Sequence, residues 1–426
     1  MKPTIQKLKN GMSVILHPVP NAKSVTVFVY CRVGSRYETR EINGASHFIE
    51  HLMFKGTKKR PNTEIIARTL DQYGANFNAM TSKDYTGYYI KIDARHTDLA
   101  VDLLNDMLFH SKYDPKEIDR ERGVIIEEIN MYEDNPQMHI EDLLEEILFP
   151  NSTLGWNIAG PKKVIRNITR KQLLDYRDRY YVPNRMTIAV SGNVTPSLLK
   201  QLEATFGKRK APKTSENTSY KPFRAPVELK RPVVGQEKQT EQTQISIGFY
   251  GLPWGHPDEP AAKLLSVILG GTMSSRLFIQ VRERKGLCYT ISSYHQSLED
   301  TGIFGISAGL DRKRLPEAME TIRGELKKIL NRGVTAEELQ RAKDHIRGKL
   351  TLAFEDSSFQ SGWYGKQWMF MERTETPEER MKLLDAVTVT DVKRVARVIF
   401  RPSQMASAMI GPNAGTKTLE KLFKWE

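Results

Sequence analysis

The chain repeats one order of predicted elements after about 200 residues, and this repeat constrains its fold more than any other feature. The predicted strands are 25–33, 75–81, 85–93 and 186–192 in the first half and 244–250, 287–296, 301–310 and 406–412 in the second. The predicted helices are 63–73, 97–110, 114–131, 138–148 and 170–181, then 261–269, 275–284, 316–331 and 335–353. Helices grouped against a mostly antiparallel sheet are typical of an α+β sandwich. We therefore expect two homologous α+β sandwich domains.

A basic segment separates the two halves. Between residues 207 and 232 the chain carries eight Lys and Arg against two Glu, a net charge of +6 out of +13 for the whole chain. The segment is also rich in Pro, Ser and Thr, which is typical of a solvated linker. At 426 residues the chain is too long for one ordinary core. We expect an N-terminal domain at 1–206, a linker at 207–233 and a C-terminal domain at 234–426.

The composition argues against several classes of protein. No apolar run approaches the length of about 18 residues that a transmembrane helix needs, and the N-terminus shows no apolar signal segment. Cys31 and Cys288 lie in strand-like surroundings, so we expect buried thiols rather than a disulfide, in a reducing, cytoplasmic compartment. No recognition motif accompanies the positive charge, so we expect neither nucleic-acid nor membrane partners.

The first candidate site is the sequence His-Phe-Ile-Glu-His at 47–51. Residues three and four apart share a face of a helix, so the imidazoles of His47 and His51 can converge on one metal ion beside the carboxylate of Glu50. Two neutral His nitrogens suit Zn²⁺, and a third protein ligand with a water would complete a catalytic site. Glu50 is then free to act as a base. This H-x-x-E-H spacing is the inverted zinc-protease signature, and the alternative is a surface helix with two solvated His.

The second candidate site is the helix predicted at 114–131, with Pro115 at its first position. Glu121 and Glu128 are seven residues apart and share one face of this helix, whereas Glu127 points elsewhere. The alternative interpretation is a charged face turned to solvent.

Taken together, these residues resemble a known family. His47, Glu50 and His51, followed by Glu-Arg-Gly-Val-Ile-Ile-Glu-Glu-Ile from Glu121, are similar to the M16 peptidases, which include pitrilysin, insulin-degrading enzyme and mitochondrial processing peptidase. The short bacterial members are the most similar, and the resemblance spans essentially the whole chain. It implies a LuxS/MPP-like metallohydrolase fold, with His47, His51 and Glu128 as zinc ligands. It also implies Glu50 as the general base and Glu121 as a supporting acid.

The second half has lost the metal chemistry. No His lies between 260 and 271, and alignment of the long helices places Ala342 opposite Glu121 and Lys349 opposite Glu128. In the family resembled, two related halves or two chains enclose a chamber like a clamshell. The second half would then supply substrate contacts.

The resemblance also assigns substrate-binding residues in both halves. The segment from Gly271 to Tyr289 is similar to the family's C-terminal signature, in which Arg282 and Tyr289 reach toward the substrate. A Tyr hydroxyl can donate a hydrogen bond to the oxyanion that forms at the scissile carbonyl. The strand at 74–81 would take the peptide as an added strand, with Asn78 and Ala79 nearest the scissile bond.

These observations predict a zinc-dependent endopeptidase that hydrolyses unstructured peptides in an enclosed chamber. The expected cofactor is Zn²⁺, the expected partners are peptide substrates, and a homodimer is expected. The alternative is a catalytically silent scaffold or partner subunit, although silent relatives usually lack one of the residue sets found here.

Overall fold

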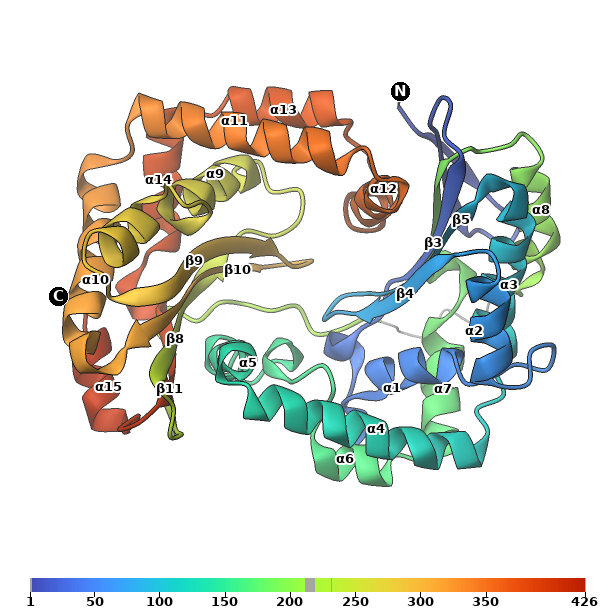
Figure 1. The fold of residues 1–426 in the computed structure, drawn as a ribbon, viewed down its shortest axis with the longest axis horizontal. Helices are drawn as coiled ribbons and strands as arrows, with labels where there is room; N and C mark the ends of the chain where they lie inside the picture. Colours follow the sequence, from blue (N-terminus) through green and yellow to red (C-terminus); the bar gives the residue numbers. More distant parts are fainter. Residues whose placement is uncertain (1, 211–218, 231, 426) are drawn as a thin grey trace. The chain divides into compact units, whose positions relative to one another are not determined.

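The computed structural model describes residues 2–210, 219–230 and 232–425, and these residues form two compact units (Figure 1). Unit 1 consists of residues 1–129, 157–221 and 350–377. Unit 2 consists of residues 130–156, 222–349 and 378–426. Within the described residues, no helix is both long enough and apolar enough to span a bilayer.

Unit 1 is built on a mixed sheet. Among the described residues this sheet has six strands in the order β1-β2-β6-β3-β5-β4, and β2 with β6 is its parallel pair. The bounds are β1 Thr4–Lys7, β2 Ser13–Pro18, β3 Ser24–Cys31, β4 Asn76–Thr81, β5 Thr86–Asp93 and β6 Met186–Gly192. Apolar side chains at alternate positions of β3 and β5 face the main core, and β4 is the last strand of the order and so lies at an edge of the sheet.

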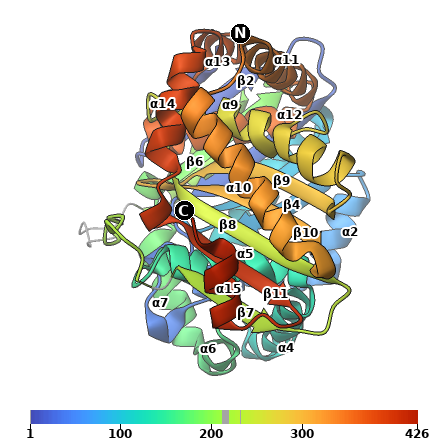
Figure 2. The same ribbon diagram turned by 90° about the vertical axis from the view of Figure 1, so that its left-hand side faces the viewer.

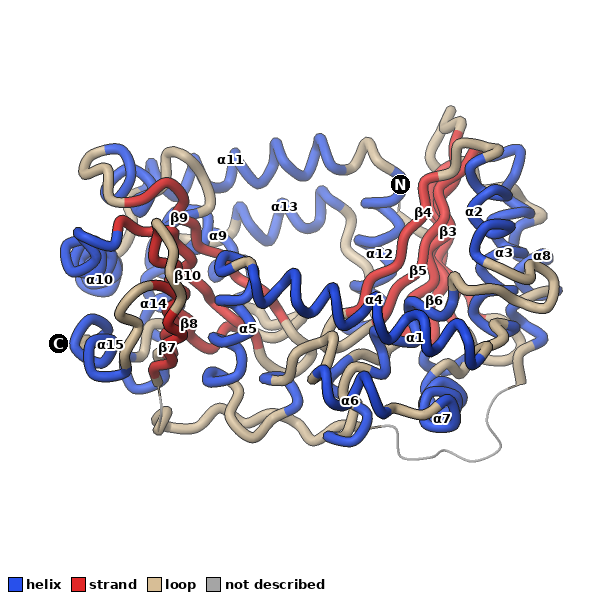
Figure 3. The backbone as a smooth tube through the Cα atoms, turned by 60° about the horizontal axis from the view of Figure 1, so that its bottom comes forward, coloured by secondary structure: helices blue, strands red, loops and turns tan. Residues whose placement is uncertain are grey.

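Helices cover both faces of the unit 1 sheet, as the blue and red tubes of Figure 3 show. The helices are α1 Ala45–Met53, α2 Thr63–Asp71, α3 Thr97–His110, α4 Pro115–Asp134, α6 Lys162–Asn167, α7 Arg170–Tyr180, α8 Leu198–Ala204 and α12 Ser357–Met371. Helices α1 and α3 pack on the main-core face, and α12 packs across β3 and β6 on the opposite face.

Unit 2 repeats this plan. Its described residues form a five-stranded sheet in the order β7-β11-β8-β10-β9, in which β7 and β11 are parallel, as β2 and β6 are in unit 1. The strands are β7 Val233–Glu237, β8 Gln242–Gly251, β9 Cys288–Ser297, β10 Gly302–Asp311 and β11 Ala406–Gly411. The helices are α5 Pro136–Leu148, α9 Glu259–Gly270, α10 Leu315–Arg332, α11 Ala336–Ala353, α13 Pro377–Asp385, α14 Val389–Ile399 and α15 Thr416–Phe423. Figure 2 turns unit 2 toward the viewer, with α10, α14 and α15 in front of its sheet.

The two units differ from the continuous domains expected at 1–206 and 234–426, because two helices are exchanged. Helix α5 comes from the first half of the chain but packs on β8 and β11 of unit 2, and α12 comes from the second half but packs in unit 1. Glu141 fixes α5 to the unit 2 sheet by accepting hydrogen bonds from Tyr294 Oη at 2.6 Å and Ser246 Oγ at 3.1 Å.

The linker expected to be solvated is partly packed. Residues 211–218 and 231 of this segment lie outside the described residues. Tyr220 lies under the guanidinium of Arg36 in unit 1, with the Arg36 Cζ 3.6 Å from the ring centroid. Phe223 packs against the core of unit 2, where Leu229 is buried. The prediction of a solvated linker was wrong for these residues, because their apolar side chains pack against the two units.

The predictions for the two cysteines and for the helix at 275–284 are partly confirmed. Both cysteines are free thiols, as predicted, but only Cys31 is fully buried, and Cys288 is half-buried. The helix predicted at 275–284 forms as a π-helix over Phe278–Glu283. Such a π-turn widens the helix locally and is often found at functional sites.

Candidate metal site

Helix α1 carries the H-x-x-E-H sequence on an amphipathic helix. Phe48, Ile49 and Leu52 are buried in the main core of unit 1, which leaves the His47, Glu50 and His51 side chains on the partly exposed face. Because the helix is only nine residues long, its position depends on what holds its two ends.

The N-terminus of α1 is held by a buried carboxylate that precedes it in the sequence. Glu38 accepts hydrogen bonds from the backbone N–H groups of Gly44 and Ser46, each at 2.7 Å, and from the Asn43 side chain at 2.9 Å. These acceptors satisfy N–H groups that have no partner within the helix. Burial raises the pKa of Glu38, against the lowering effect of these hydrogen bonds. Gly44 has φ +100°, and a Cβ there would lie 2.5 Å from the carbonyl oxygen of Ala159.

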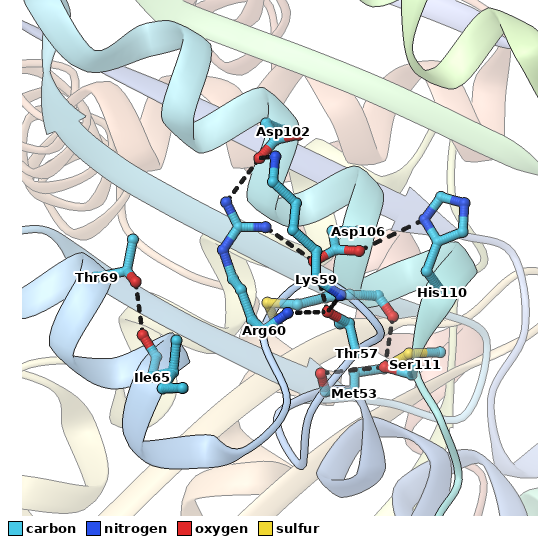
Figure 4. A network of polar contacts seen from close by, with 11 residues as sticks. Met53, Thr57, Lys59, Arg60, Ile65, Thr69, Asp102, Asp106, His110 and Ser111 are labelled. Carbon is cyan, nitrogen blue, oxygen red and sulfur yellow. Dashed lines mark hydrogen bonds and ion pairs between the residues drawn. The ribbon is translucent and has the colours of Figure 1, made fainter.

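The C-terminal end of α1 is held by the polar network of Figure 4. Ser111 Oγ donates to the Met53 carbonyl at 3.3 Å, which ties the last turn of α1 to the end of α3. In the loop that follows α1, Arg60 Nη1 and Thr57 Oγ1 both donate to Asp106 Oδ2, at 2.8 and 2.6 Å. The Arg60–Asp106 pair is nearly buried, with 8% of each side chain exposed. Both ends of the short helix are therefore fixed by buried polar contacts.

Glu128 of α4 joins the two imidazoles of α1. Its Oε2 lies 3.5 Å from His47 Nε2 and 3.5 Å from His51 Nε2. In the described part of the chain, His47, His51 and Glu128 are the set whose ligand atoms, all within 4.8 Å of one another, could hold a metal ion. Glu127, the neighbour expected to point elsewhere, is exposed.

The geometry and the donor set fit zinc. Tetrahedral bonds of about 2.1 Å place ligand atoms roughly 3.4 Å apart, which matches the two N···O separations of 3.5 Å. Burial, reinforced by His51, lowers the pKa of His47 to about 4, which favours the neutral form of the ring that a metal ion requires. The His47 nitrogen that faces Glu128 is Nε2, while Nδ1 is buried and has no hydrogen-bond partner among the described residues.

Glu121 of α4 supports the second imidazole from behind. Its Oε2 lies 3.1 Å from His51 Nδ1, and its Oε1 lies 2.6 Å from the ammonium of Lys55. Although burial raises the pKa of Glu121, the hydrogen bonds from His51 and Lys55 hold it below its ordinary value. Burial lowers the pKa of His51, but its contacts with Glu121 and Glu128 outweigh burial and raise it to about 9, so a metal ion that binds here would displace a proton from this ring. A carboxylate that accepts from Nδ1 leaves Nε2 to face the metal position.

Glu50 connects the helix to the edge of the sheet. Its Oε2 accepts a hydrogen bond from the hydroxyl of Thr81, which is the last residue of β4. Burial raises the pKa of Glu50, against this hydrogen bond, which lowers it. The candidate base therefore lies beside the end of the edge strand.

The candidate strand-addition residues lie on this edge strand. Among the described residues β4 pairs with β5 alone, and Asn78 is exposed while Ala79 packs against the main core. Asn78 Oδ1 accepts from the backbone N–H of Ala79 at 2.8 Å, so a side chain occupies a hydrogen-bonding position that an added strand could take.

Arg282 and Tyr289 lie together in unit 2. Arg282 is in the π-helix, with its Cζ 5.3 Å from the Tyr289 ring centroid and 4.7 Å from that of Phe278. Tyr289, at the start of β9, is 69% exposed. The structure thus brings this pair together on the surface of unit 2, whereas the metal-site residues belong to unit 1.

Comparison with known proteins identifies the family. The model described as Insulinase (Peptidase family M16) matches residues 13–162, and that described as Peptidase M16 inactive domain matches residues 167–346. The Bacillus subtilis (strain 168) protein named uncharacterized zinc protease YmxG is 38% identical over 405 residues, covering 95% of this chain and 97% of that protein. The chain belongs to peptidase family M16. The resemblance inferred from the motifs is therefore confirmed.

Solved structures agree with the M16 fold. A protease from Helicobacter pylori has a TM-score of 0.90 at 24% identity and covers 96% of this chain and 99% of its own. A peptidase M16 inactive domain from Pseudomonas fluorescens has a TM-score of 0.88 at 19% identity and covers 97% of this chain and 98% of its own. The prediction of two related domains, each with helices packed on a sheet, is thus confirmed.

Three residues that support the candidate site were not predicted from the sequence. Lys55 lies four residues after His51, so helical spacing could have indicated that it follows the same face. Glu38 and Thr81 reach α1 through tertiary contacts, and no local pattern marks them.

Proposed function

We propose that this chain is a zinc-dependent endopeptidase that hydrolyses unstructured peptides. The observation that carries the proposal is the convergence of His47 Nε2, His51 Nε2 and Glu128 Oε2 beside Glu50. Membership of a peptidase family, with relatives named zinc proteases, supports the same assignment.

Each of the candidate residues in unit 1 would have a separate role in hydrolysis. His47, His51 and Glu128 would hold the zinc ion, which when bound supplies a Lewis acid and lowers the pKa of water. Glu50 takes the proton of the attacking water and passes it to the leaving amine, while Thr81 orients the Glu50 carboxylate. Glu121 holds His51 with Nε2 toward the metal position.

The edge strand β4 would bind the peptide. An added strand forms main-chain hydrogen bonds to the free edge, and this mode tolerates many sequences but requires an extended, unfolded substrate. Asn78 and Ala79 would lie nearest the scissile bond, which requires the Asn78 side chain to release the Ala79 N–H. Because Thr81 at the end of the same strand donates a hydrogen bond to Glu50, a peptide added to β4 would lie next to Glu50.

Three further features stay predictions from the family resemblance. They are the contacts of Arg282 and Tyr289 with the substrate, the enclosed chamber and the homodimer. The catalytically silent alternative is disfavoured by the complete set of His47, Glu50, His51 and Glu128. The family description of residues 167–346 as an inactive domain fits a second half without metal ligands.

The proposal is tested by zinc analysis and a pair of substrates. We expect about one zinc per chain, cleavage of a casein-derived peptide of about 20 residues, and no cleavage of a compact disulfide-bonded protein. Removal of zinc by a chelator should abolish peptide cleavage, and added zinc should restore it. Metal-free protein with full activity, or rapid cleavage of the folded protein, would contradict the proposal.

A further inference from the structure

We propose that Arg36 is a positioning residue for the candidate base Glu50, and that it acts by fixing the turn at the end of the edge strand β4. The proposal rests on the proposed function, because it gives Arg36 a role in the same hydrolysis. It deepens that function, since it assigns a role to a buried ion pair outside the set of candidate ligands.

The contact between Thr81 and Glu50 joins two elements that are far apart in the sequence. Glu50 lies on α1, Thr81 ends β4, and the two residues are 31 positions apart. The turn at residues 82–85 follows Thr81 and is closed by a hydrogen bond from the Ser82 N–H to the Tyr85 carbonyl at 2.8 Å. The position of the Thr81 hydroxyl therefore depends on what fixes this turn.

Two consecutive residues bind three consecutive residues of this turn. The Ser35 N–H donates to the Ser82 carbonyl at 3.2 Å. The Arg36 N–H donates to the Lys83 carbonyl at 3.1 Å. The Arg36 guanidinium donates from Nη1 to Asp84 Oδ1 at 2.7 Å. Arg36 is thus bonded to the turn by its main chain and by its side chain.

The Arg36–Asp84 pair is buried. Only 1% of the Arg36 side chain and 3% of the Asp84 side chain are exposed. The ring of Tyr220 covers the guanidinium, with its centroid 3.6 Å from Arg36 Cζ. Separation of a buried pair leaves uncompensated charge, so the turn cannot move away from Arg36 without a large cost in free energy. The ion pair therefore restrains the turn more strongly than a hydrogen bond exposed to solvent would.

Gly34 allows the turn to lie directly against this segment. A Cβ at residue 34 would lie 2.1 Å from the Ser82 carbonyl oxygen and 2.5 Å from that of Lys83. The φ of Gly34 is −163°, an extended conformation that any residue adopts. The close approach of the turn, and not the backbone conformation, therefore requires glycine here.

The same segment is bonded to α1, the helix of the candidate base. Glu38 accepts hydrogen bonds from two backbone N–H groups at the start of α1. The Tyr176 hydroxyl donates to the Gly34 carbonyl at 3.2 Å and lies 3.0 Å from the Ser46 hydroxyl. Residues 34–38 therefore connect the turn after β4 to the helix that carries the base.

Loss of the Arg36–Asp84 pair should separate Thr81 from Glu50 without removal of a candidate ligand. The three candidate ligands lie on α1 and α4, so zinc content should not change. A hydrogen bond to a charged group is worth about 10- to 100-fold in an equilibrium. A displacement of about 1 Å at a reacting group costs a comparable factor in rate. We therefore expect kcat to fall by about 10- to 100-fold, with KM close to the wild-type value.

The test compares kcat, KM and zinc content in three variants. Arg36→Met combined with Asp84→Val replaces the ion pair by apolar side chains, a change that buried pairs often tolerate without loss of stability. Thr81→Val removes the hydroxyl that contacts Glu50. Each should lower kcat by about 10- to 100-fold. The triple variant should have the kcat of Thr81→Val, because the contact that the ion pair preserves is already absent. A merely structural role would lower kcat further in the triple variant.

Gly34→Ala tests the same turn with both charges in place. Its added methyl group should displace the turn and lower kcat as loss of the ion pair does. Gly123→Ala is the matched control, because an added Cβ there would have no atom of another described segment within 4 Å. The control should keep the wild-type kcat.

Three results would overturn the role of Arg36 and leave the proposed function standing. They are a wild-type kcat in both Gly34→Ala and the variant without the ion pair, losses of kcat that add in the triple variant, and loss of zinc in both altered proteins. Absence of any cleavage by wild-type protein would overturn the proposed function and the role of Arg36 with it.

Discussion

Glu121→Gln isolates the contribution of a residue that would not touch the metal. The carboxylate accepts from His51 Nδ1 at 3.1 Å and from Lys55 Nζ at 2.6 Å, and the Glu121 side chain is only 2% exposed. Glutamine keeps the shape but has one acceptor oxygen. Because the Lys55 contact is shorter and fully charged, the amide oxygen should stay with Lys55, so the NH₂ group would face His51 Nδ1.

An NH₂ group at this position favours the wrong tautomer of His51. The ring would accept at Nδ1 and carry its proton on Nε2, the atom that faces the metal position. Loss of such a supporting carboxylate typically lowers zinc affinity by about 10- to 100-fold, or about 1.4 to 2.7 kcal/mol.

Competition with a chromophoric chelator measures this change directly. Glu117→Gln is the matched control, because Glu117 lies on the same helix and pairs with the exposed Arg120. The control should bind zinc like wild type. If Glu121→Gln bound zinc with wild-type affinity while retaining its fold by circular dichroism, the assigned role of Glu121 would be refuted.

Two further predictions concern the loop after α1 and the second half. Asp106→Asn, which breaks the nearly buried pair with Arg60, should lower the free energy of unfolding by about 3 to 5 kcal/mol in denaturant titrations. Lys59→Ala, which removes the exposed contact with Asp102, should cost at most about 1 kcal/mol, and equal effects would contradict the argument from burial. Tyr289→Phe should lower kcat with unchanged zinc content, since a donor to the oxyanion acts mainly in the transition state. An unchanged kcat would remove the Tyr289 hydroxyl from the mechanism.

The sequence predicted the parts of the site that depend on helical spacing. His47 and His51 share a face because they are four residues apart, and the structure places them together as expected. Glu128 could be chosen over a solvated alternative only through the family resemblance, because nothing local shows where α4 returns to α1. The Glu38 and Thr81 contacts are likewise tertiary and leave no periodic signal.

The fold was predictable to the level of two related sandwiches. The packing of α5 in unit 2 could not be predicted from the sequence. Its apolar face, with Ile140, Leu144 and Leu148, does not itself specify which of the two sheets it packs on. What decides its place is complementarity to the partner sheet. Leu144 fits against Gly248, where an added Cβ would lie 2.9 Å from its side chain, and Glu141 meets hydroxyl donors.

The most direct test of the proposed site is one measurement on Glu50→Gln. This substitution keeps the three candidate ligands and the hydrogen-bonding shape but removes the base. Zinc content and single-turnover cleavage of one peptide should be measured on the same sample. The account predicts about one zinc per chain and a cleavage rate lowered by about 10²- to 10⁴-fold. Wild-type cleavage by Glu50→Gln with zinc bound would contradict it.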